Sequence, residues 1–127
     1  MALDVLSNRV IGCAIEVHKH LGPGLLESAY EECLAHELTE HGIPFQRQAA
    51  VPVQYKGLCL DCAYRLDLVV DKQLILELKC VETMLPIHEA QLITYLKLSG
   101  IHVGLLINFN ESRLKNGLKR IVLNYPE

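Results

Sequence analysis

The chain has 127 residues, half of them hydrophobic, and a formal net charge of −3 at pH 7. This length and apolar fraction predict one folded domain over residues 1–127 and exclude an intrinsically disordered chain. The acidic balance argues against an avid, non-specific nucleic-acid-binding protein, which would carry a basic surface.

The sequence predicts neither a membrane span nor export. No apolar run approaches the roughly 18 to 20 residues needed to cross a bilayer. The first ten residues, MALDVLSNRV, lack the basic and then apolar pattern of a secretory signal. The five cysteines are an odd number without regular spacing, which favours a reducing compartment. We therefore expect a cytoplasmic protein with no membrane partner.

Two helices are predicted in the N-terminal third of the chain. The first covers about residues 7–20, with Ser7 as its N-cap. Its apolar residues recur at helical spacing: Val10, Ala14, Val17 and Leu21. The second helix is expected over about residues 25–41, and Gly42 supplies its left-handed stop.

Glu27 is the unusual residue of the second predicted helix. It lies in the first turn, near the same stripe as Tyr30, and that stripe otherwise has the apolar character of a buried face. A carboxylate at this position interacts favourably with the helix N-terminal dipole. Spacing alone therefore leaves two interpretations of Glu27: a stabilising first-turn carboxylate or a member of a site.

Strands follow the two helices. Phe45 to Tyr55 has the character of a strand, in which Pro52 marks an edge or a bulge. A turn at Lys56-Gly57 leads into a return strand over Leu58 to Cys62.

The next stretch, Tyr64 to Lys79, has the pattern of a hairpin with its turn centred on Lys72. That register pairs apolar residues with apolar residues: Leu66 with Leu78, Leu68 with Leu76, and Val70 with Leu74. It also sets Asp67 opposite Glu77, with Lys79 on the same face as Glu77. Two facing carboxylates repel each other, so we expect something to offset the repulsion, most simply a divalent cation.

The rest of the chain completes an α/β pattern. Pro86 to Ser99 is predicted as a helix ended by Gly100. On it, His88, Gln91 and Tyr95 share a face away from the core stripe, which spacing alone does not distinguish from a solvent-exposed face. Val103 to Asn108 is predicted as a buried strand, and Lys119 to Leu123 as a final strand or a helical tail. The order α-α-β-β-β-β-α-β-β predicts a mixed sheet flanked by helices.

The strongest chemical cluster is formed by Asp67, Glu77 and Lys79. Mg²⁺ and similar hard cations take oxygen ligands and are often held by one or two carboxylates plus water and phosphate. Such an ion activates water for phosphodiester hydrolysis, and a lysine beside it stabilises the developing charge. The alternative is a solvated strand face, because charged residues alternate on many exposed strands.

The chain also resembles a known family. Gly24-Leu25-Leu26-Glu27-Ser28-Ala29-Tyr30 matches the G-x-x-E-x-x-Y signature of the GxxExxY family, which is similar to the PD-(D/E)XK nuclease-like superfamily. The resemblance covers roughly residues 8–122 and includes YRLDLVV, LILELK, HEAQLITYL and VGLLINF. It implies a restriction-endonuclease-like core.

The resemblance further implies roles for individual residues. Asp67 and Glu77 would be catalytic metal ligands and Lys79 the catalytic lysine, while Glu27 would be a metal-binding carboxylate from the helix. Candidates for positioning the substrate or supporting the site are Gln91, Tyr95 and Tyr30, the first two as a Q-x-x-x-Y element. Leu66 stands where the proline of "PD" would be, but that proline is not a metal ligand.

Two functional hypotheses follow. The first is a Mg²⁺- or Mn²⁺-dependent nuclease, with DNA as the first expected substrate and RNA as the second; the sequence does not decide between them. The second is a non-catalytic module that keeps the fold and binds nucleic acid or a protein partner. A homodimer is compatible with so apolar a chain.

Overall fold

The computed structural model describes residues 1–124, without the side chains of residues 61–63. Its helices are α1 (Leu3–Leu21), α2 (Glu27–Glu40) and α3 (Pro86–Ser99), with a short 3-10 helix η1 (Leu114–Gly117). Its strands are β1 (Phe45–Tyr55), β2 (Leu58–Val70), β3 (Leu74–Lys79), β4 (Val103–Asn108) and β5 (Leu118–Val122).

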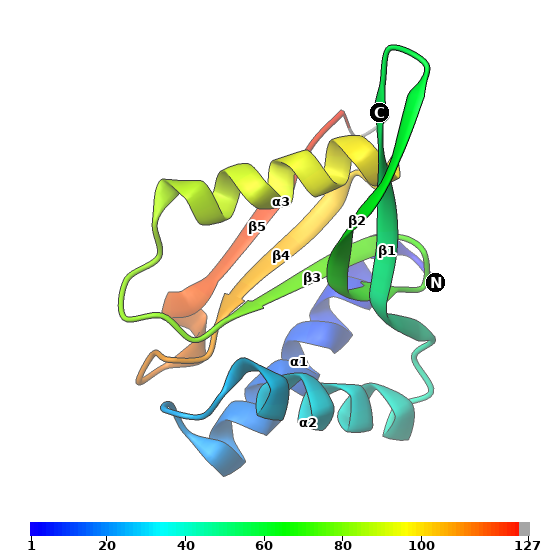
Figure 1. Ribbon diagram of the computed structural model, residues 1–127. Helices are drawn as coiled ribbons and strands as arrows, with labels where there is room; N and C mark the ends of the chain where they lie inside the picture. Colours follow the sequence, from blue (N-terminus) through cyan, green and yellow to red (C-terminus); the bar gives the residue numbers. More distant parts are fainter. Residues whose placement is uncertain (125–127) are drawn as a thin grey trace.

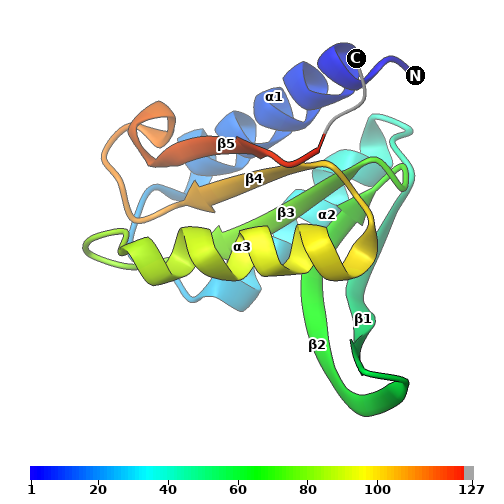
Figure 2. The same cartoon turned by 90° about the horizontal axis from the view of Figure 1, so that it is seen from above.

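The described strands form one mixed sheet in the order β1-β2-β3-β4-β5. Neighbouring strands are antiparallel except β3 and β4, which are parallel and are joined through α3. Helices α1 and α2 cover one face of the sheet and α3 covers the other, as Figures 1 and 2 show. The predicted α/β class, a mixed sheet flanked by helices, is confirmed.

Two hydrophobic clusters fill the spaces between the layers. The cluster under α1 and α2 takes the β3 side chains of one face, Leu74, Leu76 and Leu78. The cluster under α3 takes Ile75 from the opposite face of β3, together with Leu92 and Leu96 of the helix. The alternation predicted for β3 is therefore confirmed, and Glu77 and Lys79 follow Ile75 on the α3 face.

One predicted strand boundary is wrong. The two strands expected over Leu58–Cys62 and from Tyr64 onward are a single strand, β2. The residues between them include neither glycine nor proline, so nothing interrupts the extended chain. The resulting β1–β2 hairpin is long, and its end projects past α3 (Figure 2). The register of β1 against β2 shifts between Val51 and Val53, which confirms the bulge predicted at Pro52.

The start of the first helix also differs from the prediction. Helix α1 begins at Leu3, and Ala2 rather than Ser7 is its N-cap. Ser7 lies inside the helix, buried, and its hydroxyl has no hydrogen-bond partner among the described residues. Leu6, fully buried, extends the apolar stripe one turn upstream, which is the reason that the helix starts earlier.

The remaining element predictions agree with the structure. Helix α3 has the predicted bounds, and Gly100 ends it in the left-handed conformation at φ 75°. The final element is a strand, β5, and not a helical tail. None of the described helices is long and apolar enough to cross a membrane. The single-domain organisation and the cytoplasmic location stay predictions.

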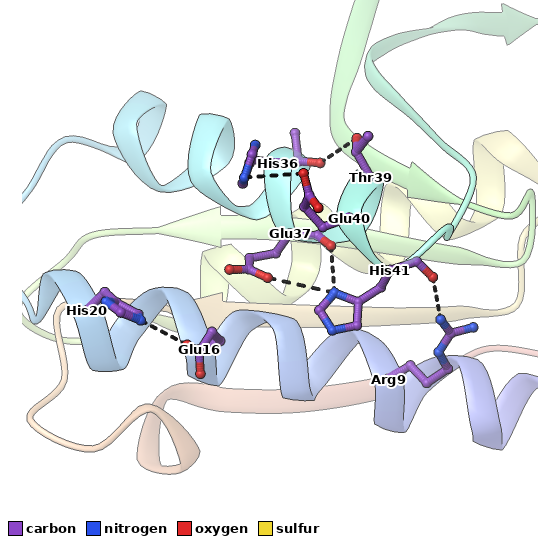
Figure 3. Close-up of polar contacts among 9 residues, drawn as sticks. Arg9, Glu16, His20, His36, Glu37, Thr39, Glu40 and His41 are labelled. Atoms are coloured by element: carbon purple, nitrogen blue, oxygen red, sulfur yellow. Dashed lines mark hydrogen bonds and ion pairs between the residues drawn. The ribbon is translucent and has the colours of Figure 1, made fainter.

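Polar contacts on the outer surface of α1 and α2 fix the two helices against each other (Figure 3). The Arg9 guanidinium donates to the His41 carbonyl oxygen at the end of α2. His41 in turn contacts the Glu37 side chain at 3.7 Å. The Arg9 bond thus links α1 to the end of α2, the His41–Glu37 contact lies within that end of α2, and Glu27 is at the other end of α2.

Candidate active site

The predicted hairpin register is correct near the turn and then stops. Leu68 pairs with Leu76 and Val70 with Leu74, about a turn formed by residues 71–73. The expected Leu66–Leu78 pair does not form, because the ladder between β2 and β3 ends after Leu68. Leu66 consequently packs in the cluster under α3, whereas Leu68 packs under α1 and α2. The prediction that both share one face is wrong.

The ladder stops where Asp67 enters the gap between the two strands. The Leu78 N–H donates to Asp67 Oδ2 at 2.8 Å, and the Asp67 N–H donates to Glu77 Oε1 at 3.2 Å. Side-chain oxygens thus replace the backbone acceptors of a regular ladder. Asp67 and Glu77 lie close together, as predicted. They are linked by a hydrogen bond from the Asp67 backbone to the Glu77 side chain and do not form a regular cross-strand pair.

The pairing of β2 with its other neighbour, β1, also lacks a pair at Asp67. Pairs Arg47–Leu68 and Ala49–Leu66 flank the Asp67 position, and Gln48 between them has a φ of 50°. A non-glycine residue in the left-handed region is strained. On the β1 side only the pair at Asp67 is missing, and the ladder resumes in the same register, whereas the β2–β3 ladder ends after Leu68. Asp67 therefore lies at a local break in the sheet.

Burial is the largest cause of a raised pKa at both carboxyl groups. Burial, and next the charge of Asp67, raise the pKa of Glu77 to about 8, and this side chain is buried. The pKa of Asp67 is also raised, first by burial and further by Glu31 and Glu27, while the Leu78 N–H and Lys79 oppose the shift. Without a bound cation, the pair holds a proton near neutral pH.

Lys79 is positioned by the last residues of β3. It lies on the Glu77 face, half-buried, and pairs in the parallel ladder with Asn108 of β4. Its ammonium group lowers the pKa of both carboxyl groups. It makes no ion pair within 4 Å among the described residues, so it is available to a ligand.

Glu27 reaches the same edge of the sheet from α2. It is the first residue of the helix, exposed, and its Oε2 accepts a long hydrogen bond of 3.4 Å from the Cys80 N–H. A shallow depression of about 320 Å³ joins Glu27 to Asp67, and its lining also includes Ser28, Glu31, Gln48 and Leu78. Glu27 therefore faces the break, although it does not contact Asp67 or Glu77 directly.

Tyr30 supports the start of α2 from inside the core. It is fully buried, and its ring stacks on Phe109 with centroids 4.4 Å apart. Its hydroxyl donates to the Gly22 carbonyl oxygen at 2.5 Å and accepts from the Leu25 N–H at 3.2 Å. Tyr30 thus closes the loop that precedes Glu27 and has no surface on which to contact a substrate.

Sequence reasoning missed Glu31, one turn after Glu27 on the same helix. It is buried, Arg47 donates two hydrogen bonds to its Oε2, and Gln48 donates one of 2.7 Å to its Oε1. Both oxygens are occupied, so Glu31 acts on the site through its charge. The i, i+4 spacing from Glu27 was the available signal.

Asn108 was missed as well. It is fully buried at the end of β4, its amide donates to the Val81 carbonyl oxygen at 2.9 Å, and its Oδ1 accepts from the Val81 N–H at 3.1 Å. This reciprocal pair fixes the backbone two residues after Lys79. A single polar residue ending the run VGLLI was the only hint in the sequence.

Tyr95 of α3 and Tyr64 of β2 form an aromatic pair on the α3 side of the site. Tyr95 is half-buried, and burial, followed by the charges of Glu77 and Asp67, raises its pKa. Its ring lies 6.0 Å from that of Tyr64 on β2, with the planes tilted by 47°. Gln91 is exposed one turn earlier and makes no hydrogen bond to the described residues. His88 instead accepts from the Leu85 N–H and caps the helix.

The donor set fits a hard divalent cation, although the side chains do not enclose one. Among the described residues, no three His, Cys, Asp or Glu side chains are grouped closely enough to hold an ion. Mg²⁺ nevertheless needs only one or two protein carboxylates. Asp67 Oδ2 and Glu77 Oε1 take the backbone bonds, which leaves the second oxygen of each carboxylate for an ion. A cation would also offset the charge of Asp67, which after burial is the next cause of the raised pKa of Glu77.

Comparisons with known proteins agree with this architecture. Residues 4–121 match a family model described as the PD-(D/E)XK nuclease superfamily, whose members usually use divalent metal ions. The crystal structure of SSO0001 is similar to the chain, with a TM-score of 0.59 and 19% identity. The similarity covers 78% of this chain and 50% of the SSO0001 chain, so the chain spans about half the length of that protein. A search of curated proteins finds no match. Together these findings confirm the restriction-endonuclease-like fold.

Proposed function

Because the chain belongs to the PD-(D/E)XK nuclease superfamily, we propose that it is a divalent-metal-dependent nuclease that hydrolyses phosphodiester bonds. The observation that carries the proposal is the pair Asp67 and Glu77 in the break of the sheet, together with Lys79, whose ammonium forms no ion pair with the part of the chain that the structure describes. DNA is the first substrate to test, and RNA the second. The match of residues 24–30 to G-x-x-E-x-x-Y supports a closer relationship to the GxxExxY family.

In this proposal Asp67 and Glu77 hold the metal ion, and Glu27 approaches it from α2 across the shared depression. Mg²⁺ or Mn²⁺ would polarise a phosphoryl oxygen and lower the pKa of a bound water. The raised pKa of Glu77 means that ion binding displaces a proton at neutral pH. Ion affinity is therefore expected to rise with pH.

The other residues act around the carboxylates. Lys79 orients the attacking water or stabilises the charge that develops on the phosphate oxygens. Tyr95 and Gln91 position the substrate along α3, and Tyr30 supports Glu27 by holding the loop before it. In hydrolysis the water oxygen bonds to phosphorus and the ester P–O bond breaks. The leaving oxygen takes up a proton, which balances the one that the water loses.

A cleavage assay tests this proposal. Labelled single- and double-stranded DNA and RNA would be incubated with the protein in Mg²⁺, in Mn²⁺ and in a chelator. We expect metal-dependent cleavage that Asp67→Ala abolishes and that the exposed-surface control Glu82→Gln preserves. Absence of cleavage on every substrate, or equal cleavage by Asp67→Ala, would contradict the nuclease function.

One observation favours the second candidate, a binding module without catalysis. The described side chains form no cluster of three ligands around an ion position. Calorimetric titration with Mn²⁺ separates the two candidates, because the nuclease requires ion binding that Glu77→Gln removes. A protein that binds nucleic acid equally well with and without metal, and binds no ion, would be such a module. Formation of a homodimer stays a prediction for sedimentation analysis.

A further inference from the structure

Tyr64 lies beside the proposed site but has no role in the chemistry described above. It stands on β2 three residues before Asp67, about 10 Å along an extended strand. Its ring contacts that of Tyr95 on α3. Tyr95 packs against the cluster under α3 that contains Leu66 and Ile75, the neighbours of the two carboxylates along their strands. The Tyr64 ring therefore lies on the α3 face, which also carries Glu77.

The Tyr64 ring is open to solvent. Its exposed fraction is 51%, high for a large aromatic residue that already has a ring neighbour. The rings are tilted by 47° and not stacked, so Tyr95 does not cover a face of the Tyr64 ring. A single exposed aromatic residue is ordinary on a protein surface. The position at the edge of a carboxylate site is what requires an explanation.

Among the described residues, no lysine or arginine lines the depression beside the site, and Arg47 pairs with Glu31. Glu27, Glu31 and Asp67 line the depression, and the whole chain has a net charge of −3. Duplex binders gain most of their affinity from Lys and Arg contacts to phosphates. Proteins that bind single strands add base stacking on aromatic side chains, which does not depend on charge. Stacked duplex bases do not present their faces to a side chain.

We propose that the site takes single-stranded nucleic acid and that Tyr64 stacks on a base next to the reacting phosphate. This inference rests on the proposed nuclease function and names its substrate class. Tyr95 supports the Tyr64 ring from behind, and the break at Asp67 receives the phosphate and its ion.

The test measures binding under conditions without cleavage. A Lys79→Met background prevents turnover, and the ligand is a fluorescein-labelled single-stranded oligodeoxynucleotide of about 16 nucleotides, compared with its duplex. We expect Tyr64→Leu to weaken single-strand affinity about 10-fold or more and Tyr64→Phe to retain it. The matched control is Tyr55→Leu, an equally exposed tyrosine near the hairpin end whose ring already carries the Lys56 ammonium at 5.4 Å.

A second measurement reports stacking directly and does not depend on the Leu variant being folded. The chain contains no tryptophan, so Tyr64→Trp introduces a single fluorophore that keeps the aromatic face. Oligonucleotide binding is expected to quench its emission, while the emission of Tyr55→Trp changes little. Equal quenching in both variants would overturn the assignment to Tyr64.

Three further outcomes would also overturn the inference. These are unchanged affinity in Tyr64→Leu, tighter binding of the duplex than of the single strand, and a change of oligomeric state on loss of the Tyr64 ring. The last outcome would identify Tyr64 as a contact between copies of the chain. Metal-dependent cleavage by the intact protein is scored separately, so a failed nuclease proposal and a failed stacking proposal give different results.

Discussion

Glu77→Gln is expected to remove a large pH dependence of stability from the metal-free protein. The folded protein holds the pKa of Glu77 at about 8, against 4.5 for the ordinary side chain. Because the folded state binds this proton more tightly, the free energy of unfolding is highest below about pH 4.5 and decreases until about pH 8. The raised pKa of Asp67 acts in the same direction.

The size of the effect follows from the displacement of the pKa. Each pKa unit is worth about 1.4 kcal/mol, so Glu77 makes the metal-free protein about 3 to 4 kcal/mol less stable at pH 8 than at pH 5. This is a large share of the 5–15 kcal/mol typical of a small domain. It corresponds to about 10 °C in the melting temperature. Glutamine can still accept from the Asp67 N–H, but it carries no charge.

Thermal and urea unfolding between pH 5 and 8 in a chelator would measure this dependence. We expect the parent protein to lose stability over this range, and Glu77→Gln to lose less, because only the raised pKa of Asp67 remains, and to be more stable than the parent at pH 8. Mg²⁺ or Mn²⁺ should restore the stability of the parent protein at pH 8 and should leave the stability of Glu77→Gln unchanged. Glu82→Gln, an exposed carboxylate after β3, should follow the parent. A parent curve that is flat with pH would refute the argument.

Three other substitutions separate chemistry from structure. Lys79→Met is expected to lower single-turnover cleavage about 100-fold or more while ion binding by calorimetry persists. Gly117→Ala should cost about 1–3 kcal/mol in urea unfolding, because its Cβ would lie 2.3 Å from the Asn108 carbonyl oxygen. Tyr30→Phe keeps the stacked ring but loses the hydroxyl bonds to the loop before α2, and should cost about 1 kcal/mol.

Particular results would contradict these expectations. Loss of ion binding in Lys79→Met would mean that the lysine holds the carboxylates in place. Gly12→Ala is the control for Gly117, since nothing lies within 4 Å of its added Cβ. It should stabilise α1 by about 0.5–1 kcal/mol. Tyr30→Phe with unchanged stability would show that the loop does not need the hydroxyl.

Local pattern was enough to place most elements. Helix α3 was predicted with its bounds because Pro86 opens it and Gly100 ends it, and strand β4 because its apolar run continues up to Asn108. The turn of the β2–β3 hairpin followed from matching Leu68 to Leu76. The same alternation led to Asp67 and Glu77, since a period of two makes only one register apolar on the buried face.

Long-range features were not accessible in this way. The resemblance alone suggested that Glu27, Tyr95 and the hairpin meet, because no periodicity relates segments on different elements. The role of Glu31 depends on Arg47 and Gln48, which β1 brings beside α2. Distances between elements are set by how the helices pack on the sheet, and sequence spacing does not encode them.

The amino-acid sequence by itself determined the α/β architecture and the two carboxylates that face each other near the end of the hairpin. Only the tertiary structure decided how they meet. The β2–β3 ladder ends at Asp67 and the β1–β2 ladder lacks one pair there. The Asp67 carboxylate accepts from the Leu78 N–H, and the Glu77 carboxylate accepts from the Asp67 N–H. The physical reason is that burial beneath two packed layers raises the energy of both charges, and burial is a property of the assembled layers and not of the strand pattern.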